Sequence, residues 1–143
     1  MDLYDELRGL VTVLEQQHVE YAICGGVALA FHGYPRFTKD IDLLILATDC
    51  DRVLAIAERR GFLDPAGRIP LENGDVYRTS KIVGTSILTL DLLLVNAALE
   101  DVWNGREVYC WKGLDVQVVS AQGLVKMKRM AGRDQDLLDV KKL

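Results

Sequence analysis

The sequence has few cysteines, and it has no long uncharged apolar run. Its three cysteines, Cys24, Cys50 and Cys110, stand far apart and form no C-x-x-C pair. This odd, dispersed count argues against a disulfide framework or a zinc site, and it is typical of reduced thiols in the cytoplasm. No apolar stretch approaches the ~20 residues of a membrane span, and the acidic N-terminus MDLYDELRG is unlike a secretory signal. We therefore expect a cytoplasmic protein with no membrane segment.

An excess of positive charge is also absent. The chain carries 17 lysine and arginine residues against 21 aspartate and glutamate residues, a formal net charge of −4. This balance gives no support for a broad nucleic-acid surface. Hydrophobic residues make up 50% of the sequence, which excludes intrinsic disorder. Because a length of 143 residues suits one globular unit, we expect a single domain over residues 1–143.

The hydrophobic pattern changes between helical and strand periodicity along the chain. It predicts helices over 2–17 and 27–31, and a third that Asp49 or Asp51 caps and that ends near Gly61. Strands are predicted at 21–24, 40–47, 76–82, 86–95, 107–111 and 116–119, with a helical turn or two within 96–103. Ser120 and Asp134 are expected to cap later helices, and the proline- and glycine-rich segment 64–74 to be a loop. This order predicts an α/β (α+β) domain with a mixed β-sheet flanked by helices, and it leaves the strand order open.

One of three D-x-D triplets stands out from the others. The triplets at 49–51 and 134–136 precede predicted helices, where aspartate is a common cap. Asp40 and Asp42 instead begin an apolar strand, so that their side chains point the same way with Cα atoms ~6.5 Å apart. Two ionised carboxylates this close repel each other unless a cation lies between them, and Mg²⁺ prefers such oxygen ligands. The alternative is a solvated strand end.

Asp91 is the third candidate carboxylate. It lies within the apolar run 87–95, where an ionised carboxylate is costly unless it is paired or ligates a metal. If this strand runs beside the one that carries Asp40 and Asp42, all three acids face the same point. The alternative is a simple salt bridge to Arg36 or Lys81.

A Gly25-Gly26 turn lies between the first predicted strand and the short helix that follows. Backbone N–H groups at such a turn bind phosphate, and glycine lets the phosphate approach closely. A purely geometric turn is the alternative. The sequence contains neither G-x-G-x-x-G nor G-x-x-x-x-G-K, which disfavours dinucleotide-binding and P-loop proteins.

Two groups of polar residues are candidate phosphate contacts. Arg36, Thr38 and Lys39 lie between the glycine turn and the acids, and arginine offers a planar fork that suits phosphate. Further along the chain, Lys126, Arg129 and Arg133 follow a helical spacing. The alternative for these residues is an ordinary solvated surface.

These features together resemble a known superfamily. Residues 24–45, CGGVALAFHGYPRFTKDIDLLI, resemble the signature of the DNA polymerase β-type nucleotidyltransferases: a glycine turn, a short helix, D-x-D on the next strand and a third acid on a later one. The form of the motif is similar to small prokaryotic members, which include AbiEii-type toxins and the lincosamide and aminoglycoside nucleotidyltransferases. Residues 120–140 resemble the closing helices of that group.

The resemblance implies a nucleotidyltransferase fold and a magnesium-dependent reaction. An NMP group would pass from an NTP to a hydroxyl of RNA, protein or a small molecule. Asp40, Asp42 and Asp91 would be the catalytic ligands of two Mg²⁺ ions, for which Mn²⁺ is the substitute. Gly25, Gly26, Arg36, Thr38, Lys126 and Arg133 would bind the nucleotide.

Several biological roles agree with this resemblance. A toxin–antitoxin or abortive-infection component, with an antitoxin partner or as a homodimer, is the first. An antibiotic-modifying nucleotidyltransferase is the second, and a non-catalytic nucleotide-binding or antitoxin-like module is the third. Many relatives carry a further helical domain, so the acceptor site here is expected to be shallow, shared with another subunit or completed by a partner.

Overall fold

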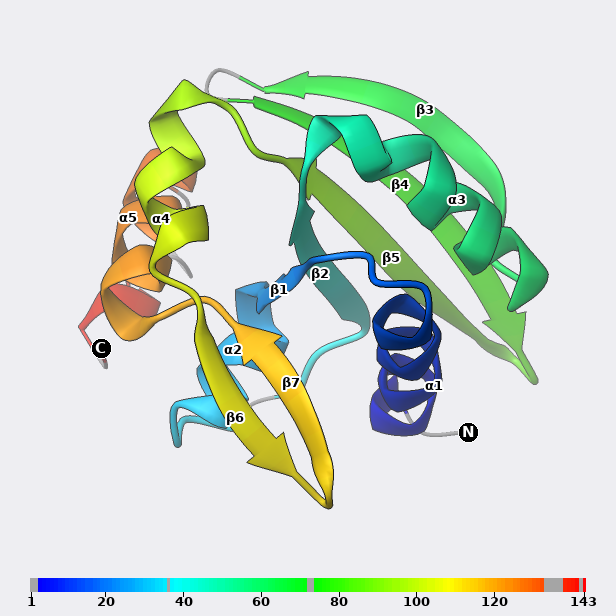
Figure 1. Ribbon diagram of the computed structural model, residues 1–143, viewed down its shortest axis with the longest axis horizontal. Coiled ribbons are helices and arrows are strands. Elements are labelled where there is room, and N and C mark those ends of the chain that lie inside the picture. Colours follow the sequence, from blue (N-terminus) through cyan, green and yellow to red (C-terminus); the bar gives the residue numbers. More distant parts are fainter. Residues whose placement is uncertain (1–2, 36, 72–73, 133–137, 142) are drawn as a thin grey trace.

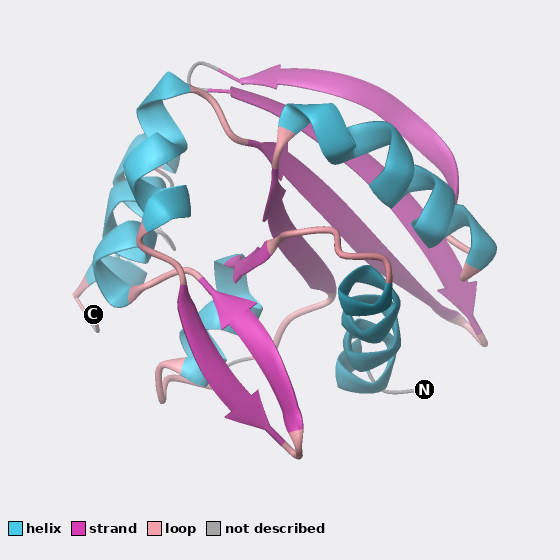
Figure 2. Ribbon diagram, in the orientation of Figure 1, coloured by secondary structure: helices cyan, strands magenta, loops and turns pink. Residues whose placement is uncertain are grey.

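The chain folds around one mixed β-sheet (Figures 1 and 2). The computed structural model describes residues 3–35, 37–71, 74–132, 138–141 and 143, with the backbone alone for 64–71 and 74. The strands are β1 (Ala22–Cys24), β2 (Asp40–Ile45), β3 (Leu63–Leu71), β4 (Gly74–Val83), β5 (Ser86–Leu94), β6 (Glu107–Trp111) and β7 (Leu114–Val118). The helices are α1 (Leu3–Gln16), α2 (Gly25–Phe31), α3 (Cys50–Arg59), α4 (Glu100–Asn104) and α5 (Ala121–Ala131), with 3₁₀ turns η1 (Ala47–Asp49) and η2 (Ala97–Leu99). The α/β class and the mixed sheet are therefore confirmed.

The strand order places β2 at the middle of the sheet. Within the described residues the order is β3-β4-β5-β2-β1-β7-β6. Strand β2 pairs with β5 in parallel and with β1 antiparallel, and β4 and β5 form an antiparallel hairpin. The segments that carry the predicted carboxylates are therefore direct neighbours.

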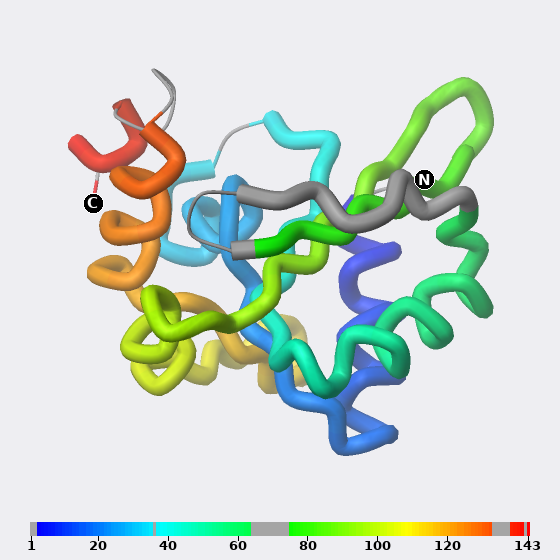
Figure 3. Tube along the Cα trace, turned by 90° about the horizontal axis from the view of Figure 1, so that it is seen from above, coloured from blue at the N-terminus to red at the C-terminus, as the bar shows by residue number. Residues whose placement is uncertain are grey.

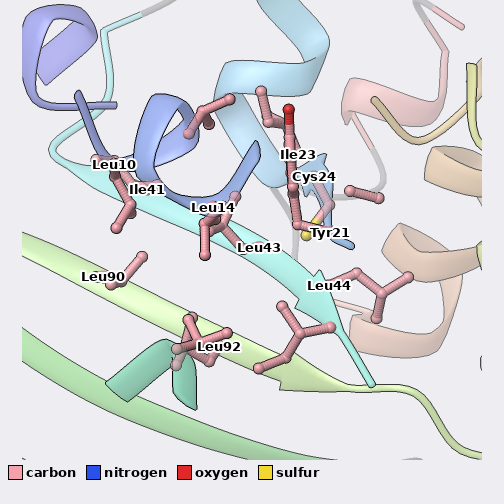
Figure 4. Close-up of a cluster of buried hydrophobic side chains, with 14 of the residues drawn as sticks. Leu10, Leu14, Tyr21, Ile23, Cys24, Ile41, Leu43, Leu44, Leu90 and Leu92 are labelled. Atoms are coloured by element: carbon pink, nitrogen blue, oxygen red, sulfur yellow. The ribbon is translucent and has the colours of Figure 1, made fainter. Parts of the chain in front are cut away.

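The two faces of the sheet differ in what covers them. Helices α1 and α3 lie in front of the sheet in Figure 1 and α2 lies behind it, and Figure 3 shows the same arrangement from above. Leu10 and Leu14 of α1 point toward β2 (Figure 4). Several side chains on this face are fully inaccessible, among them Ile41, Leu43, Leu90 and Leu92. Burial of each contributes about 1.5–3 kcal/mol, so this face holds the domain together.

The predicted loop at 64–74 is wrong. Residues 63–71 form β3 and β4 begins at Gly74, and the pairing between the two strands shifts between Leu63 and Gly67. Pro65 and Pro70 made a strand look improbable, but β3 is an edge strand, where a missing backbone N–H is tolerated.

The predicted helix boundaries hold with small differences. Helix α2 begins at Gly25 rather than at residue 27. Ser120 caps α5 as predicted, because its side chain accepts from the Gly123 N–H at 3.0 Å. Asp49 is the N-cap residue of α3 but makes no side-chain cap bond, and the predicted cap at Asp134 lies outside the described residues. No helix in the described part of the chain is long and apolar enough to cross a membrane.

Candidate active site

Three neighbouring strands bring two acids and an arginine into one row. Asp42 of β2 is the register partner of Asp91 of β5, and Asp91 is in turn the partner of Arg78 of β4. Cα partners on adjacent strands point to the same face of a sheet. The row therefore lies on the face opposite α1 and α3, and Cys24 of β1 extends it beyond Asp42.

Asp40 adds a third carboxylate to the same face. It stands two residues before Asp42, at the first position of β2, and its register partner is Thr89. Asp40 and Asp42 are partly exposed, whereas Asp91 is only 7% exposed. The three acids Asp40, Asp42 and Asp91 thus share one end of one sheet face, and two of them are open to solvent.

Asp91 is paired with an arginine that the sequence analysis did not single out. Arg78 donates from Nε to Oδ1 at 2.8 Å and from Nη2 to Oδ2 at 3.1 Å. This forked bond to Asp91 raises the pKa of Arg78, with smaller contributions from Asp40 and Asp42. The predicted alternative partner Lys81 instead donates to Glu6 of α1 on the other face, at 3.0 Å.

A hairpin register would have revealed Arg78. A two-residue turn, Gly84-Thr85, joins β4 to β5, and Gly84 has a φ of +61°. Such turns fix the pairing of the strands that they join. Counting back from the Val83–Ser86 pair places Arg78 opposite Asp91.

Gly25 fits closely against the carboxylate of Asp42. Its φ is +64°, and a Cβ atom at this position would overlap Oδ2 of Asp42. The residue must therefore be glycine both for its backbone conformation and for the space that Asp42 occupies. The next residue, Gly26, is buried in the first turn of α2.

The negative charge of this row affects the pKa of the neighbouring Cys24 thiol. Burial first, and then Asp42 and Asp91, raise the pKa of its thiol well above 9.0, although Lys128 acts in the opposite direction. Lys128 of α5 is itself buried and forms an ion pair with Asp139 at 3.0 Å. Lys128, a residue to which the sequence analysis gave no role, is therefore a buried cation of α5 whose charge acts on Cys24.

The other predicted nucleotide contacts have different environments. Lys126 donates to Asp101 of α4 at 2.8 Å, on the surface of the protein. Thr38 bonds the backbone of Asp40 through its hydroxyl, which accepts from the Asp40 N–H at 3.3 Å. Arg36 and Arg133 lie outside the described residues.

An open pocket of about 750 Å³ borders Asp40. Its lining combines apolar side chains, among them Phe37 and Ile87, with the hydroxyl groups of Thr38, Ser86 and Thr89. Phe37 is 84% exposed and Ile87 is 61% exposed. The pocket therefore offers a mixed apolar and hydroxyl surface directly beside Asp40.

The three acids have the chemistry of ligands for a divalent cation. Carboxylate oxygens are the ligands that Mg²⁺ and Mn²⁺ prefer, and Asp40 and Asp42 are partly open on one face. Both oxygens of Asp91 accept from Arg78. Among the described residues, no three histidine, cysteine, aspartate or glutamate side chains are grouped closely enough to hold a metal ion. As arranged here, Asp40 and Asp42 would hold the ion, and Asp91 would join them only after leaving Arg78.

The comparison with protein families gives a match over most of the chain. The family model described as "Nucleotidyl transferase AbiEii toxin, Type IV TA system" matches residues 8–97. That range includes the glycine turn and all three acids. No curated protein matches the chain in sequence.

Solved structures share the architecture of this chain. The lincosamide antibiotic adenylyltransferase LnuA, with lincomycin bound, aligns with a TM-score of 0.66 and 16% identity over 96% of this chain and 93% of its own. The solution structure of the antibiotic-resistance factor ANT(2'')-Ia aligns with a TM-score of 0.67 and 15% identity, covering 99% of this chain and 83% of its own. JHP933 from Helicobacter pylori gives 0.61 and 17%, covering 96% of this chain and 62% of its own. At such low identity these likenesses establish the fold alone, and the predicted nucleotidyltransferase fold is confirmed.

Proposed function

The chain belongs to the AbiEii nucleotidyltransferase family, and on that premise we propose that the three acids are its catalytic centre. The reaction is the transfer of an NMP group from an NTP to an acceptor hydroxyl. The observation that carries the proposal is the register Asp42–Asp91, which joins two acids from distant parts of the chain on one sheet face. The catalytic unit we propose is the whole range 1–143.

Each acid has a proposed role. Asp40 and Asp42 would hold the divalent ions, with Asp91 as the further ligand, and Asp91 would also orient the acceptor hydroxyl or accept its proton. Bound Mg²⁺ or Mn²⁺ would supply positive charge that stabilises the entering and leaving oxygens. The hydroxyl oxygen forms a bond to the α-phosphorus, the bond from that phosphorus to the leaving oxygen breaks, and pyrophosphate departs.

The glycine turn is the proposed phosphate cradle. Helix α2 begins at Gly25, so its first N–H groups have no partner within the helix. The close approach of Gly25 to Asp42 supports phosphate binding beside the ions. Arg36, Thr38, Lys126 and Arg133 remain proposed nucleotide contacts, and for Lys126 this requires that its bond to Asp101 breaks.

The acceptor is proposed to enter the pocket beside Asp40. Its mixed lining suits a molecule that offers both hydroxyl groups and apolar surface. Of the similar structures, LnuA is described with lincomycin bound, whereas the family is described as a toxin. RNA, protein and small-molecule acceptors are therefore the classes to compare.

The central experiment is a transfer assay with each α-labelled NTP, Mg²⁺ and a panel of RNA, protein and small-molecule acceptors. Wild type should label one acceptor class and release pyrophosphate, and Asp42→Asn should not. Asp49→Asn is the matched control, because it changes the second D-x-D triplet away from the three acids. Magnesium-dependent nucleotide binding without transfer to any acceptor would support a non-catalytic binding module instead.

The biological context that we propose is a toxin with an antitoxin partner. This rests on the family description. Expression of the wild-type chain should slow the growth of a bacterial host, and Asp42→Asn should abolish that effect. A chain that leaves growth unchanged although it transfers NMP to a small molecule in vitro would contradict the toxin role.

A further inference from the structure

Arg78 is a cation bound directly to one of the three acids. Its guanidinium donates two hydrogen bonds to Asp91, at 2.8 and 3.1 Å. The Asp91 side chain is 9% exposed and that of Arg78 is 50% exposed. The pair therefore has a buried anionic half and a cationic half that solvent can reach.

In this geometry the guanidinium of Arg78 occupies the place at Asp91 that a bound divalent cation would take. A buried carboxylate requires a positive partner, and a guanidinium or a divalent ion can meet that need. Both Asp91 oxygens are engaged by the fork, so a divalent ion cannot gain Asp91 as a ligand while the fork is intact. Arg78 is also the half of the pair that faces solvent, with half of its side chain exposed.

We propose that Arg78 is a positioning residue that holds Asp91 in the cation-free protein and competes with the divalent ion for it. The inference rests on the proposed function, because it assumes that the ion binds at Asp40 and Asp42. It assigns Arg78 a role for which the family match gives no indication. Arg78 would hold the buried carboxylate in its present orientation through the two hydrogen bonds until the ion arrives, and would then be displaced.

The test is Mn²⁺ binding without nucleotide, measured by the electron paramagnetic resonance signal of the free ion. Arg78→Gln should bind Mn²⁺ about tenfold more tightly than wild type, because the ion no longer has to break the charged hydrogen bonds between Arg78 and Asp91. Lys39→Gln is the control for charge alone, since it removes one positive charge beside Asp40 without touching Asp91. A gain as large in Lys39→Gln as in Arg78→Gln, or no gain in Arg78→Gln, would overturn the proposal.

A measurement on the wild-type protein covers the case in which Arg78→Gln does not fold. The Arg78 Nε–H, bonded to Asp91, should give a distinct nitrogen–proton NMR signal that Arg78→Lys lacks. Titration with Mg²⁺ should move this signal to the position of a solvent-exposed arginine. A signal that stays unchanged while Asp42 resonances shift would overturn the competition but leave the proposed function intact. If wild type binds no divalent ion at all, the inference and the proposed metal site both fail.

Discussion

The two faces of β2 and β5 are built from alternate residues of the same strands, yet they have opposite properties. On one face Ile41, Leu43, Leu90 and Leu92 are fully buried, on the side where Leu10 and Leu14 of α1 pack (Figure 4). On the other face the same strands present the three acids, and Ile87 near the hairpin end is 61% exposed. Successive residues of each strand therefore point alternately into a hydrophobic core and onto a charged face.

This difference separates stability from function along a single strand. The core face needs volume and apolar surface, whereas the acidic face concentrates negative charge that only cations can balance. Substitutions on the acidic face should therefore change cation and nucleotide binding with little effect on folding. Substitutions on the core face should do the opposite.

The largest expected effect is on catalysis from the acidic face. Asp42→Asn keeps the shape of the side chain and removes its charge, so nucleotidyl transfer should fall by at least about a hundredfold. The melting temperature should stay close to that of wild type, because Asp42 is partly exposed. Transfer rates and thermal unfolding measured on the same preparation test both statements, and an active Asp42→Asn would contradict the site.

The largest expected effect on stability comes from the core face. Leu92→Ala leaves a cavity at a fully buried position and should cost about 2–5 kcal/mol of unfolding free energy. Leu93→Ala is the neighbouring control on the other face, where the side chain is only partly buried, and its cost should be smaller. Urea denaturation of both variants measures the difference. Equal losses of unfolding free energy in the two variants would contradict the difference between the two faces.

A smaller effect is expected where the backbone meets the acidic face. Gly25→Ala forces a Cβ into the space of the Asp42 carboxylate at a φ of +64°, and should cost about 1–3 kcal/mol and weaken Mn²⁺ binding. Gly84→Ala has a similar φ of +61° but meets nothing within 4 Å, so it isolates the conformational part. If Gly84→Ala weakens Mn²⁺ binding equally, the contact with Asp42 has no role.

The smallest effect concerns the thiols. Because burial, Asp42 and Asp91 raise the pKa of Cys24 above 9.0, folding favours the protonated thiol, and that contribution to stability is lost as the pH rises above about 9. Cys24 and Cys50 are buried and Cys110 is exposed. At pH 8 a thiol reagent should therefore modify one cysteine quickly in the folded protein and three after denaturation. Rapid modification of Cys24 would contradict the buried environment of the acid row.

Local pattern was enough to predict most elements and to single out the three acids as candidates. The two acids that begin the apolar strand at 40–47 and the apolar run around Asp91 are properties of neighbouring residues, so they are visible in the sequence. The strand order is different, because the β2–β5 pairing joins residues about fifty positions apart through the packed sheet. From the sequence, a meeting of Asp91 with Asp42 could therefore be predicted only on the condition that their two strands are adjacent.

The missed features have physical reasons. β3 was predicted as a loop because prolines and glycines oppose a central strand, and the sequence does not reveal that this strand lies at an edge. Arg78 was missed because a cation in a strand is ordinary by itself. Only the hairpin register shows that it faces Asp91.

The most direct test of the account is to locate the ion. Crystals grown with Mn²⁺ and a non-hydrolysable NTP analogue, with anomalous scattering measured at the manganese edge, give its position without any assay of activity. We expect a manganese peak beside the carboxylates of Asp40 and Asp42, with the nucleotide phosphates at Gly25. The guanidinium of Arg78 should then lie away from Asp91. A nucleotide and manganese bound elsewhere, with the three acids unligated, would contradict the account.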